Sequence, residues 1–411
     1  TPMRRLHQGD LGSAKTVVDL DAVVLTVIDG GQAAILAPTE ILAEQHFKGM
    51  AGLLAPINET LGRQINIQLL TGSTGANDRR ELLEQLAAGE IDLLVGTHAI
   101  IQEDVEIKNL RLAVIDEQHR FGVAQRSALR EKGFNPHILV MTATPIPRTL
   151  ALTLYGDLDL SIIDEMPPGR QVIQTRWITP RERERAYTFI KGQIAKGRQA
   201  FVVCPLVEES EKTEAKSAIE EHKRLQTQIF PKLTLGLLHG RMKADEKDKV
   251  MTAFRDGETQ ILVSTSVVEV GIDIPNASVI LIEGANRFGL AQLHQFRGRV
   301  GRGEHKSFCL LLADKVSPEV EERLQAVQDT TDGFKLAETD LQIRGPGEFF
   351  GTRQSGLPDL KLVKLSDSRL LELAREEAEL IFKEDPMLDQ PRHRQLVRRL
   401  NNFWNSESDL S

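Results

Sequence analysis

The sequence has little cysteine, no long apolar run and no signal-like start. Its two cysteines, Cys204 and Cys309, lie in the apolar runs AFVVCPL and SFCLLLA, so we expect two reduced core thiols rather than a disulfide or metal site. No apolar run approaches the ~18 residues of a membrane span. The first residues, TPMRRLHQGD, lack the apolar region of a secretory signal. These absences predict a cytoplasmic protein without a membrane partner.

The chain is too long for one ordinary hydrophobic core. Its 411 residues and 45.8 kDa favour two or three domains. A net charge of -8 argues against coating nucleic acid by bulk attraction, although it leaves room for a local basic groove. Two segments are locally basic, QFRGRVGRG and PRHRQLVRRL. The second fits either a solvated helix face or a nucleic-acid contact.

Short apolar runs alternate with helix-length polar segments in two blocks. The first block contains QAAILAPT (32–39), INIQLLTGS (65–73), IDLLVGTH (91–98), LAVIDEQH (112–119) and HILVMTAT (137–144). The second contains QAFVVCPL, LTLGLLHG, QILVST, SVILIEG and SFCLLLA. This alternation is typical of parallel sheets wrapped by helices, with ligands at the carboxyl ends of the strands. We expect an α/β fold with lobes at 1–156 and 172–314, a linker at 157–171 and a mostly helical region at 315–411.

A glycine-rich loop, GDLGSAKT, precedes the first predicted helix, TVVDLDAVVLTVI. Such a loop offers backbone N–H groups, an ammonium and a hydroxyl to a triphosphate and its magnesium ion. Lys15 would bridge the β and γ phosphates, and Thr16 would bind magnesium. An ordinary helix start is the alternative. The pattern has glycine where this chain has Ala14. If that position needs a positive φ angle, its Cβ costs about 1–2 kcal/mol.

The helix after this loop is apolar nearly all round, which predicts burial. It nevertheless carries Asp19 and Asp21, whose side chains point about 200° apart on a helix. At least one of them is therefore expected in an unfavourable place, close to a phosphate site where negative charge does not help. The sequence gives no physical account of either residue.

A second candidate site follows the strand-like run LAVI. Asp116, at the end of that run, is suited to hold magnesium through water, and Glu117 to act as a general base. An exposed loop is the alternative. Thr142 and Thr144 follow a later strand, where their hydroxyls would link loss of the γ-phosphate to lobe movement, unless they form a plain turn.

The segment QFRGRVGRG supplies Arg299 and Arg302 from the second block. Guanidinium groups stabilise the charge that develops on a transferring phosphoryl group. Together with the phosphate loop, these arginines predict two lobes that close on one nucleotide.

These motifs resemble those of superfamily 2 helicases and translocases over nearly the whole chain. APTEILAEQH, TGS, GTHAII, DEQHRFGV and TATPIPRTL are similar to first-lobe motifs, and CPLVEES, LHGRM, STSVVEVGIDIP and QFRGRVGRG to second-lobe motifs. DEQHRFG, MTATPIPRTLA and DEMPPGR together resemble the RecG family of bacterial branched-DNA translocases. FKLAETDLQIRGPGEFFGTRQSG is similar to the translocation motif of that family.

The resemblance implies two tandem RecA-like lobes and an ATP-dependent DNA helicase or translocase that remodels replication forks and recombination intermediates. ATP and Mg²⁺ would be its cofactors. Its partners would be duplex and branched DNA and a single-stranded DNA-binding protein. The implied nucleotide-binding residues are Gly9, Gly12, Ser13, Ala14, Lys15, Thr16 and Asp273, with Thr16 and Asp116 at the metal. Hydrolysis would use Lys15, Glu117, Gln295, Arg299 and Arg302. The DNA backbone would be held by Thr39, His98, Thr265, Arg344 and Gln354.

Two other functions stay open at the level of sequence. The chain begins shortly before the phosphate loop, whereas the family has an upstream adenine-recognition segment and a fork-splitting wedge domain. We therefore expect a motor fragment, or a truncated relative, that recognises branched structure poorly. Ala14, Asp19 and Asp21 leave open an ATPase-impaired DNA-binding remnant. The third possibility is an ATPase that moves something other than nucleic acid.

Overall fold

The computed structural model of the protein describes residues 2–10, 12–117, 129, 132–142, 144–147, 158–165, 172–204, 211–269, 274–314, 316–344 and 368–408. The chain divides into two compact units. The first contains Thr1–Pro145 and Leu158–Ala337, and the second contains Ile146–Asp157 and Glu338–Ser411. Both predicted parallel sheets lie in the first unit.

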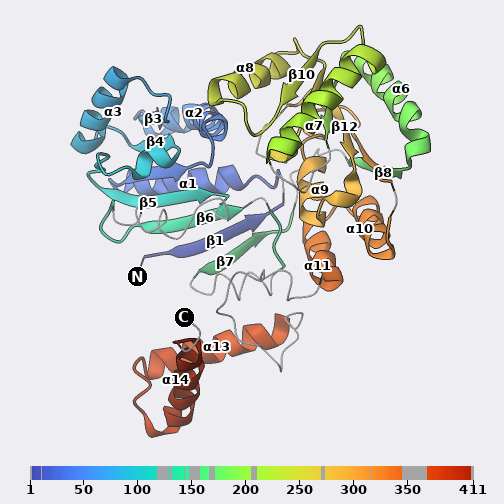
Figure 1. The fold of residues 1–411 in the computed structure, drawn as a ribbon. Helices are drawn as coiled ribbons and strands as arrows, with labels where there is room; N and C mark the ends of the chain where they lie inside the picture. Colours follow the sequence, from blue (N-terminus) through green and yellow to red (C-terminus); the bar gives the residue numbers. More distant parts are fainter. Residues whose placement is uncertain are drawn as a thin grey trace. The chain divides into compact units, whose positions relative to one another are not determined.

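The sheet of the first lobe has seven strands in the order β3-β4-β2-β5-β6-β1-β7, and all of its ladders are parallel (Figure 1). Its strands are β1 (Arg4–Gly9), β2 (Gln32–Leu36), β3 (Ile67–Leu70), β4 (Leu93–Gly96), β5 (Leu110–Asp116), β6 (His137–Thr142) and β7 (Asp159–Ile163). Each of the five predicted runs forms a strand. Because all strands are parallel, their carboxyl ends meet at one edge, where Gln8 lies opposite Thr142 and Asp116 opposite Met141.

The pattern of apolar runs misses two strands of this sheet. β1 has the polar sequence RRLHQG, but it pairs with β6 on one side and β7 on the other. This double pairing satisfies its backbone groups and buries His7 and Gln8. β7 lies inside 157–171, where we expected a linker. Since Asp159–Ile163 is hydrogen-bonded into the first sheet, a linker can begin only after Ile163.

The helices of the first lobe are α1 (Lys15–Ile28), α2 (Glu40–Leu61) and α3 (Ala76–Ala88), with the short 3-10 helix η1 (His98–Ile101). α1 and α2 share one hydrophobic core with the sheet, to which Leu20, Val23 and Met50 contribute. The prediction that α1 is buried all round is wrong. Leu25 and Ile28 are 69% and 58% exposed, because a helix packed on a sheet buries only one face.

The sheet of the second lobe has six parallel strands in the order β10-β11-β9-β12-β13-β8. They are β8 (Gln174–Ile178), β9 (Gln199–Val203), β10 (Leu235–Leu238), β11 (Ile261–Ser264), β12 (Ala277–Glu283) and β13 (Phe308–Leu312). Five of them match the predicted runs, and β8 was not predicted. The helices of this lobe are α6 (Arg183–Ile194), α7 (Glu211–Arg224), α8 (Ala244–Arg255) and α9 (Leu290–Arg297).

The chain turns helical after β13, as predicted. α10 (Pro318–Asp329) and α11 (Gly333–Arg344) follow the second lobe. The second unit contains α13 (Ser368–Glu384), the 3-10 helix η7 (Pro391–His393) and α14 (Arg394–Ser408). None of the helices in the described ranges is both long enough and apolar enough to cross a membrane. Both cysteines are free and buried, as expected for core thiols, and burial raises the pKa of Cys309 to about 12.

Candidate functional site

The phosphate loop joins β1 to α1 through left-handed turns. Gly12 has φ 76, and Ala14, the N-cap of α1, has φ 60 and ψ 26. Position 14 therefore does require a positive φ angle, the condition under which we expected the Cβ of Ala14 to be unfavourable. An L-residue in this region costs about 1–2 kcal/mol relative to glycine. The loop is also tight, since a Cβ added to Gly9 would lie 2.3 Å from Ser13 Oγ.

Lys15 lies in the first turn of α1 and points back into the loop. Its Nζ donates to the carbonyl oxygens of Gly9, at 2.8 Å, and Asp10, at 2.9 Å. Burial lowers the pKa of Lys15, and the nearby carboxylates of Glu117, Asp116, Asp10 and Asp19 act against that shift. The lysine is thus a cation surrounded by acidic groups and held by the backbone of its own loop. Thr16 follows it, with a half-buried side chain.

Asp116 ends β5, at the edge where the phosphate loop begins. Its carboxylate is buried, and Oδ2 lies 2.8 Å from Nε2 of His46 on α2. Burial acts to lower the pKa of His46, but the hydrogen bond and charge of Asp116 outweigh it, so the pKa is raised. The acidic group predicted for magnesium therefore has a histidine that fixes its orientation.

Glu117 has φ 52, a left-handed conformation that is strained for a residue with a side chain. Its N–H donates to the carbonyl of Met141 at 3.0 Å, and its Oε2 accepts from Thr142 Oγ1 at 3.3 Å. The first of these hydrogen bonds fixes the backbone of Glu117 against β6, and the second holds its carboxylate at the sheet edge. Strain of this kind gathers where a side chain must point in a functional direction.

A chain of hydroxyl contacts leads from Glu117 to the second lobe. Thr142 Oγ1 accepts from the N–H of Thr144 at 3.1 Å. Thr144 Oγ1 in turn accepts from Nε2 of Gln295 on α9 at 2.5 Å. The two threonines therefore stand between the acidic pair and the predicted glutamine of the second lobe, in the place expected of a link between lobes.

The arginines of the second lobe lie at the end of α9 and in the following turn. Arg297 and Arg299 are 2% and 3% exposed. Arg297 Nη1 donates to the carbonyls of Val327, at 2.7 Å, and Thr330, at 2.6 Å. Arg302 is half-buried, and its Nε donates to Gly298 O at 3.1 Å. Arg297 is thus tied to the end of α10 and the segment that follows it, and Arg302 to the turn that follows α9.

The residues predicted to grip DNA lie in several places. Thr39 is the N-cap of α2, and its Oγ1 accepts from Leu42 N at 3.3 Å. His98 is exposed at the start of η1. Thr265 is buried after β11, and its N–H donates to Leu238 O at 3.1 Å. Gln354, the side chain of Arg344 and the nucleotide residue Asp273 lie outside the described residues.

The two aspartates of α1 have different surroundings. Asp21 is exposed, whereas Asp19 is fully buried and lies 3.5 Å from His7 Nδ1 on β1. Burial raises the pKa of Asp19, and the nearby His7 opposes that shift. The expectation that one of them sits unfavourably is confirmed, and the structure identifies it as Asp19.

At the site, sequence reasoning missed the buried His7 and His294 and the half-buried His46, each next to a carboxylate. The partners of His46 and His294 are 70 and 284 residues away along the chain. No local motif can reveal such pairs.

The loop and the acidic edge fit a magnesium-bound triphosphate. Within the described residues, the buried Ser13 Oγ has no hydrogen-bond partner, and Lys15 is held only by carbonyl groups that a phosphate would replace. No group of three or more potential metal ligands is found among those same residues. Magnesium does not need one, because it is commonly bound by one or two carboxylates together with substrate phosphates.

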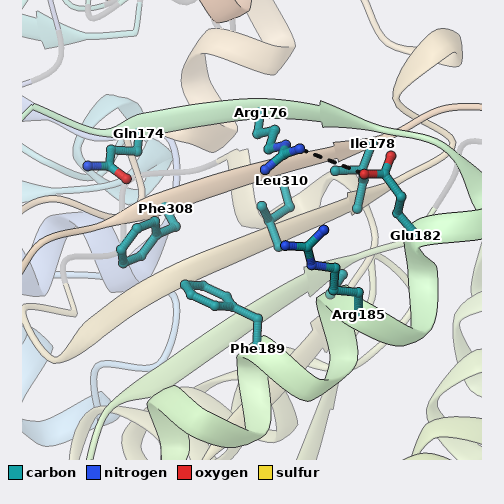
Figure 2. A pocket seen from close by; sticks show the side chains of 9 residues that line it. Gln174, Arg176, Ile178, Glu182, Arg185, Phe189, Phe308 and Leu310 are labelled. Carbon is teal, nitrogen blue, oxygen red and sulfur yellow. Dashed lines mark ion pairs between the residues drawn. The ribbon is translucent and has the colours of Figure 1, made fainter.

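The second lobe also has a pocket of about 310 Å³ between α6, the edge strand β8 and its neighbour β13 (Figure 2). Phe189 and Phe308 meet edge to face in it, with ring centroids 4.8 Å apart. Arg176 pairs with Glu182 at its rim, at 3.8 Å. Its lining contains none of the predicted site residues, so we assign it no part in the nucleotide chemistry.

Comparisons with known proteins agree with this geometry. The DEAD/DEAH box helicase model matches residues 5–153, and the helicase conserved C-terminal domain matches 183–304. Residues 330–411 match domain 3, C-terminal, of the ATP-dependent DNA helicase RecG. The curated ATP-dependent DNA helicases RecG of Synechocystis sp. and Bacillus subtilis are 54% and 50% identical to the chain, each over 95% of it. The chain belongs to the RecG family.

A solved structure of RecG bound to a three-way DNA junction superposes with a TM-score of 0.73 at 46% identity, over 90% of this chain and 48% of that one. The chain spans about half the length of the RecG proteins it matches, 46% for Synechocystis and 57% for Bacillus subtilis. The RecG family therefore accounts for the two lobes and the helical region.

Proposed function

We propose that the chain is the motor of an ATP-dependent DNA helicase and translocase that acts on branched DNA. The observation that carries the proposal is the hydrogen-bonded path from Glu117 through Thr142 and Thr144 to Gln295. It joins the acidic pair of one lobe to the arginine-bearing helix of the other. RecG relatives named as ATP-dependent DNA helicases, and a RecG structure bound to a three-way DNA junction, support the DNA substrate.

ATP and Mg²⁺ would be held mainly by the first lobe. The phosphate loop would hold the triphosphate through Gly9, Gly12, Ser13, Ala14, Lys15 and Thr16. Thr16 and Asp116 would hold magnesium, which supplies neutralising charge to the phosphates when bound. Asp273 would contact the nucleotide from the second lobe.

During hydrolysis, each of the predicted catalytic side chains has a separate role. Lys15 exchanges the carbonyls of Gly9 and Asp10 for phosphate oxygens. Glu117, oriented by Thr142, takes a proton from the attacking water. Gln295, Arg299 and Arg302 act from the second lobe, and guanidinium groups stabilise charge that develops on the transferred group. Loss of that group removes the contact that favours closed lobes, so hydrolysis alternates the grip on DNA.

The DNA grip would come from residues in both lobes and in the helical region: Thr39, His98, Thr265, Arg344 and Gln354. Contacts of this kind reach sugar and phosphate groups, which position a protein on DNA without reading its sequence. We accordingly expect activity on branched DNA to depend on the shape of the DNA.

A single-stranded DNA-binding protein is the proposed protein partner, and the cytoplasm is the proposed location. The limits 172–314 and 315–411 are supported by the matched ranges 183–304 and 330–411, whereas the first lobe extends past 156 to include β7.

A catalytically impaired DNA-binding remnant is the second candidate function. The left-handed conformation of Ala14 favours it, since a Cβ there lies where a phosphate loop usually has none. Phosphate release, measured with and without forked DNA, separates the candidates. A motor is stimulated by the fork. A remnant binds the fork without turnover, and an ATPase with another cargo is indifferent to it.

A further inference from the structure

The side chain of Asp10, in the phosphate loop, holds two elements that follow much later in the chain. Its Oδ1 lies 2.5 Å from Nε2 of His294 on α9. Its Oδ2 accepts from the backbone N–H of Gly333, the first residue of α11, at 3.2 Å. Asp10 and His294 are 6% and 5% exposed, so both contacts are shielded from water. One buried carboxylate thus joins the phosphate loop, the arginine-bearing helix and α11.

The direction of the His294 hydrogen bond follows from its other neighbour. Nδ1 of His294 lies 2.7 Å from Nη2 of Arg297. A guanidinium group can only donate, so Nδ1 accepts and the ring carries its hydrogen on Nε2. His294 therefore donates to Asp10. Arg297 also donates to Val327 O and Thr330 O, just before α11, and so extends the connection from the loop to that segment.

Gly333 permits this close approach because it has no side chain. An added Cβ would lie 2.5 Å from Pro145 Cγ, 2.6 Å from His294 Nε2 and 3.0 Å from Asp10 Oδ2. The first of these atoms belongs to the first lobe and the second to α9. The start of α11 is therefore packed directly against the residues that surround the phosphate loop.

The backbone of Asp10 is bound to the group that changes partners during nucleotide binding. Its carbonyl accepts from Lys15 Nζ at 2.9 Å and from Ser13 N at 3.1 Å. When Lys15 turns to a phosphate, that carbonyl loses its ammonium partner. Ser13 N–H still holds the carbonyl, but a backbone shift that accompanies the loss of Lys15 would carry the Cα of Asp10, and with it the carboxylate.

We propose that Asp10 is a positioning residue that couples occupancy of the phosphate loop to the way α9 and the start of α11 are held. The inference rests on the proposed function for its nucleotide. It assigns to Asp10 a task separate from phosphate binding, because its carboxylate points to the second lobe and α11. Lys15 changes its partner when nucleotide binds, and the resulting shift of Asp10 alters its hydrogen bonds to His294 and Gly333.

Hydrogen exchange of the peptide that covers 330–337 tests the coupling without any turnover. In the unchanged chain, Mg²⁺ and ADP should alter exchange of this peptide about 5-fold or more, the scale of one gained or lost hydrogen bond. In Asp10→Asn the nucleotide-dependent change should vanish. Asp21→Asn, on the exposed face of α1, is the matched control and should keep it. No change in the unchanged chain, or an undiminished change in Asp10→Asn, overturns the inference.

Strand displacement per ATP hydrolysed on forked DNA gives a second, independent readout. His294→Leu removes the donor to Asp10 and should lower this ratio about 10-fold. His294→Gln retains a donor at a similar position and should recover most of it. A merely structural role would lower hydrolysis and displacement together, leaving the ratio unchanged, and would contradict the inference. Absence of DNA-stimulated hydrolysis in the unchanged chain would refute the proposed function instead, while the exchange experiment would still decide the coupling.

Discussion

The two lobes share a parallel-sheet architecture, but their halves of the site are built differently. The first lobe places two non-glycine residues, Ala14 and Glu117, in left-handed conformations at the site. In the described parts of the second lobe, 172–204, 211–269 and 274–314, only glycines have positive φ angles. Between the described parts of the two lobes, such backbone strain is therefore found in the one that would hold the triphosphate.

Charge is distributed just as unevenly. The first lobe buries Asp10, Asp19 and Asp116 around a single lysine. The second lobe buries arginines, and Arg297 is held by two backbone carbonyls. Bound phosphates and magnesium would rebalance the first lobe, whereas the second is already arranged. This difference is the one expected of a motor in which the first lobe responds to its ligand and the second supplies preorganised cations.

The largest expected effect tests the cations of the second lobe. Arg302→Ala should lower DNA-stimulated ATPase on the order of 10³-fold, about 4 kcal/mol in barrier, because it removes charge stabilisation at the transferred group. Steady-state phosphate release measures it, with thermal unfolding to check the fold. Lys306→Ala, an exposed cation in the same loop, is the control. An unimpaired rate in Arg302→Ala would exclude Arg302 as the arginine that stabilises charge on the transferred phosphoryl group.

The next effect tests the buried charge of the first lobe. Burial raises the folded-state pKa of Asp19 above its ordinary 3.8, so stability falls as pH rises from that value through the folded pKa. Asp19→Ala should therefore stabilise the protein at neutral pH, by about 1–3 kcal/mol, and progressively less towards pH 4. Urea unfolding at several pH values measures it. The exposed Asp21→Ala should change stability by less than about 0.5 kcal/mol at every pH. Equal effects of both substitutions would contradict this account.

A smaller effect tests the contact that joins the two lobes. Thr144→Val and Gln295→Ala should each lower stimulated ATPase about 5- to 10-fold, because each removes the hydrogen bond between them. The double variant should be little worse than either single one, giving a coupling of about 1 kcal/mol. Gln328→Ala, on α10, is the control. It also removes a side-chain hydrogen bond, the one from Trp177 N, but this bond does not involve Thr144 or Gln295. Additive losses at 144 and 295 would argue against the link.

The smallest effect tests the strain itself. Ala14→Gly should relieve about 1 kcal/mol of left-handed strain, partly offset by the greater freedom of glycine in the unfolded chain. Ala22→Gly, in the right-handed interior of α1, should instead destabilise by about 0.5–1 kcal/mol. Urea unfolding compares the two, and phosphate release reports whether turnover also rises. The same sign for both variants would show that position 14 is not strained.

The sequence predicts more of the fold than of the site. Alternating apolar runs identified ten strands, because strands buried on both faces are continuously apolar. β1, β7 and β8 escaped this rule, since β1 is polar and depends on pairing from both sides, and polar residues interrupt the sequences of β7, DLSII, and β8, QTRWI. At the site, the rule that ligands gather at strand ends correctly brought Asp116, Glu117 and Thr142 to the edge near Lys15.

Sequence alone determined that two parallel-sheet lobes carry a phosphate loop, an acidic pair and an arginine segment, because each of these is encoded within a few neighbouring residues. Tertiary structure alone decided that Asp10 holds His294 and Gly333, that His46 orients Asp116, and that Asp19 is the buried aspartate of α1. Such contacts depend on how distant strands and helices meet. A hydrogen bond between residues hundreds of positions apart leaves no local pattern from which it could be predicted.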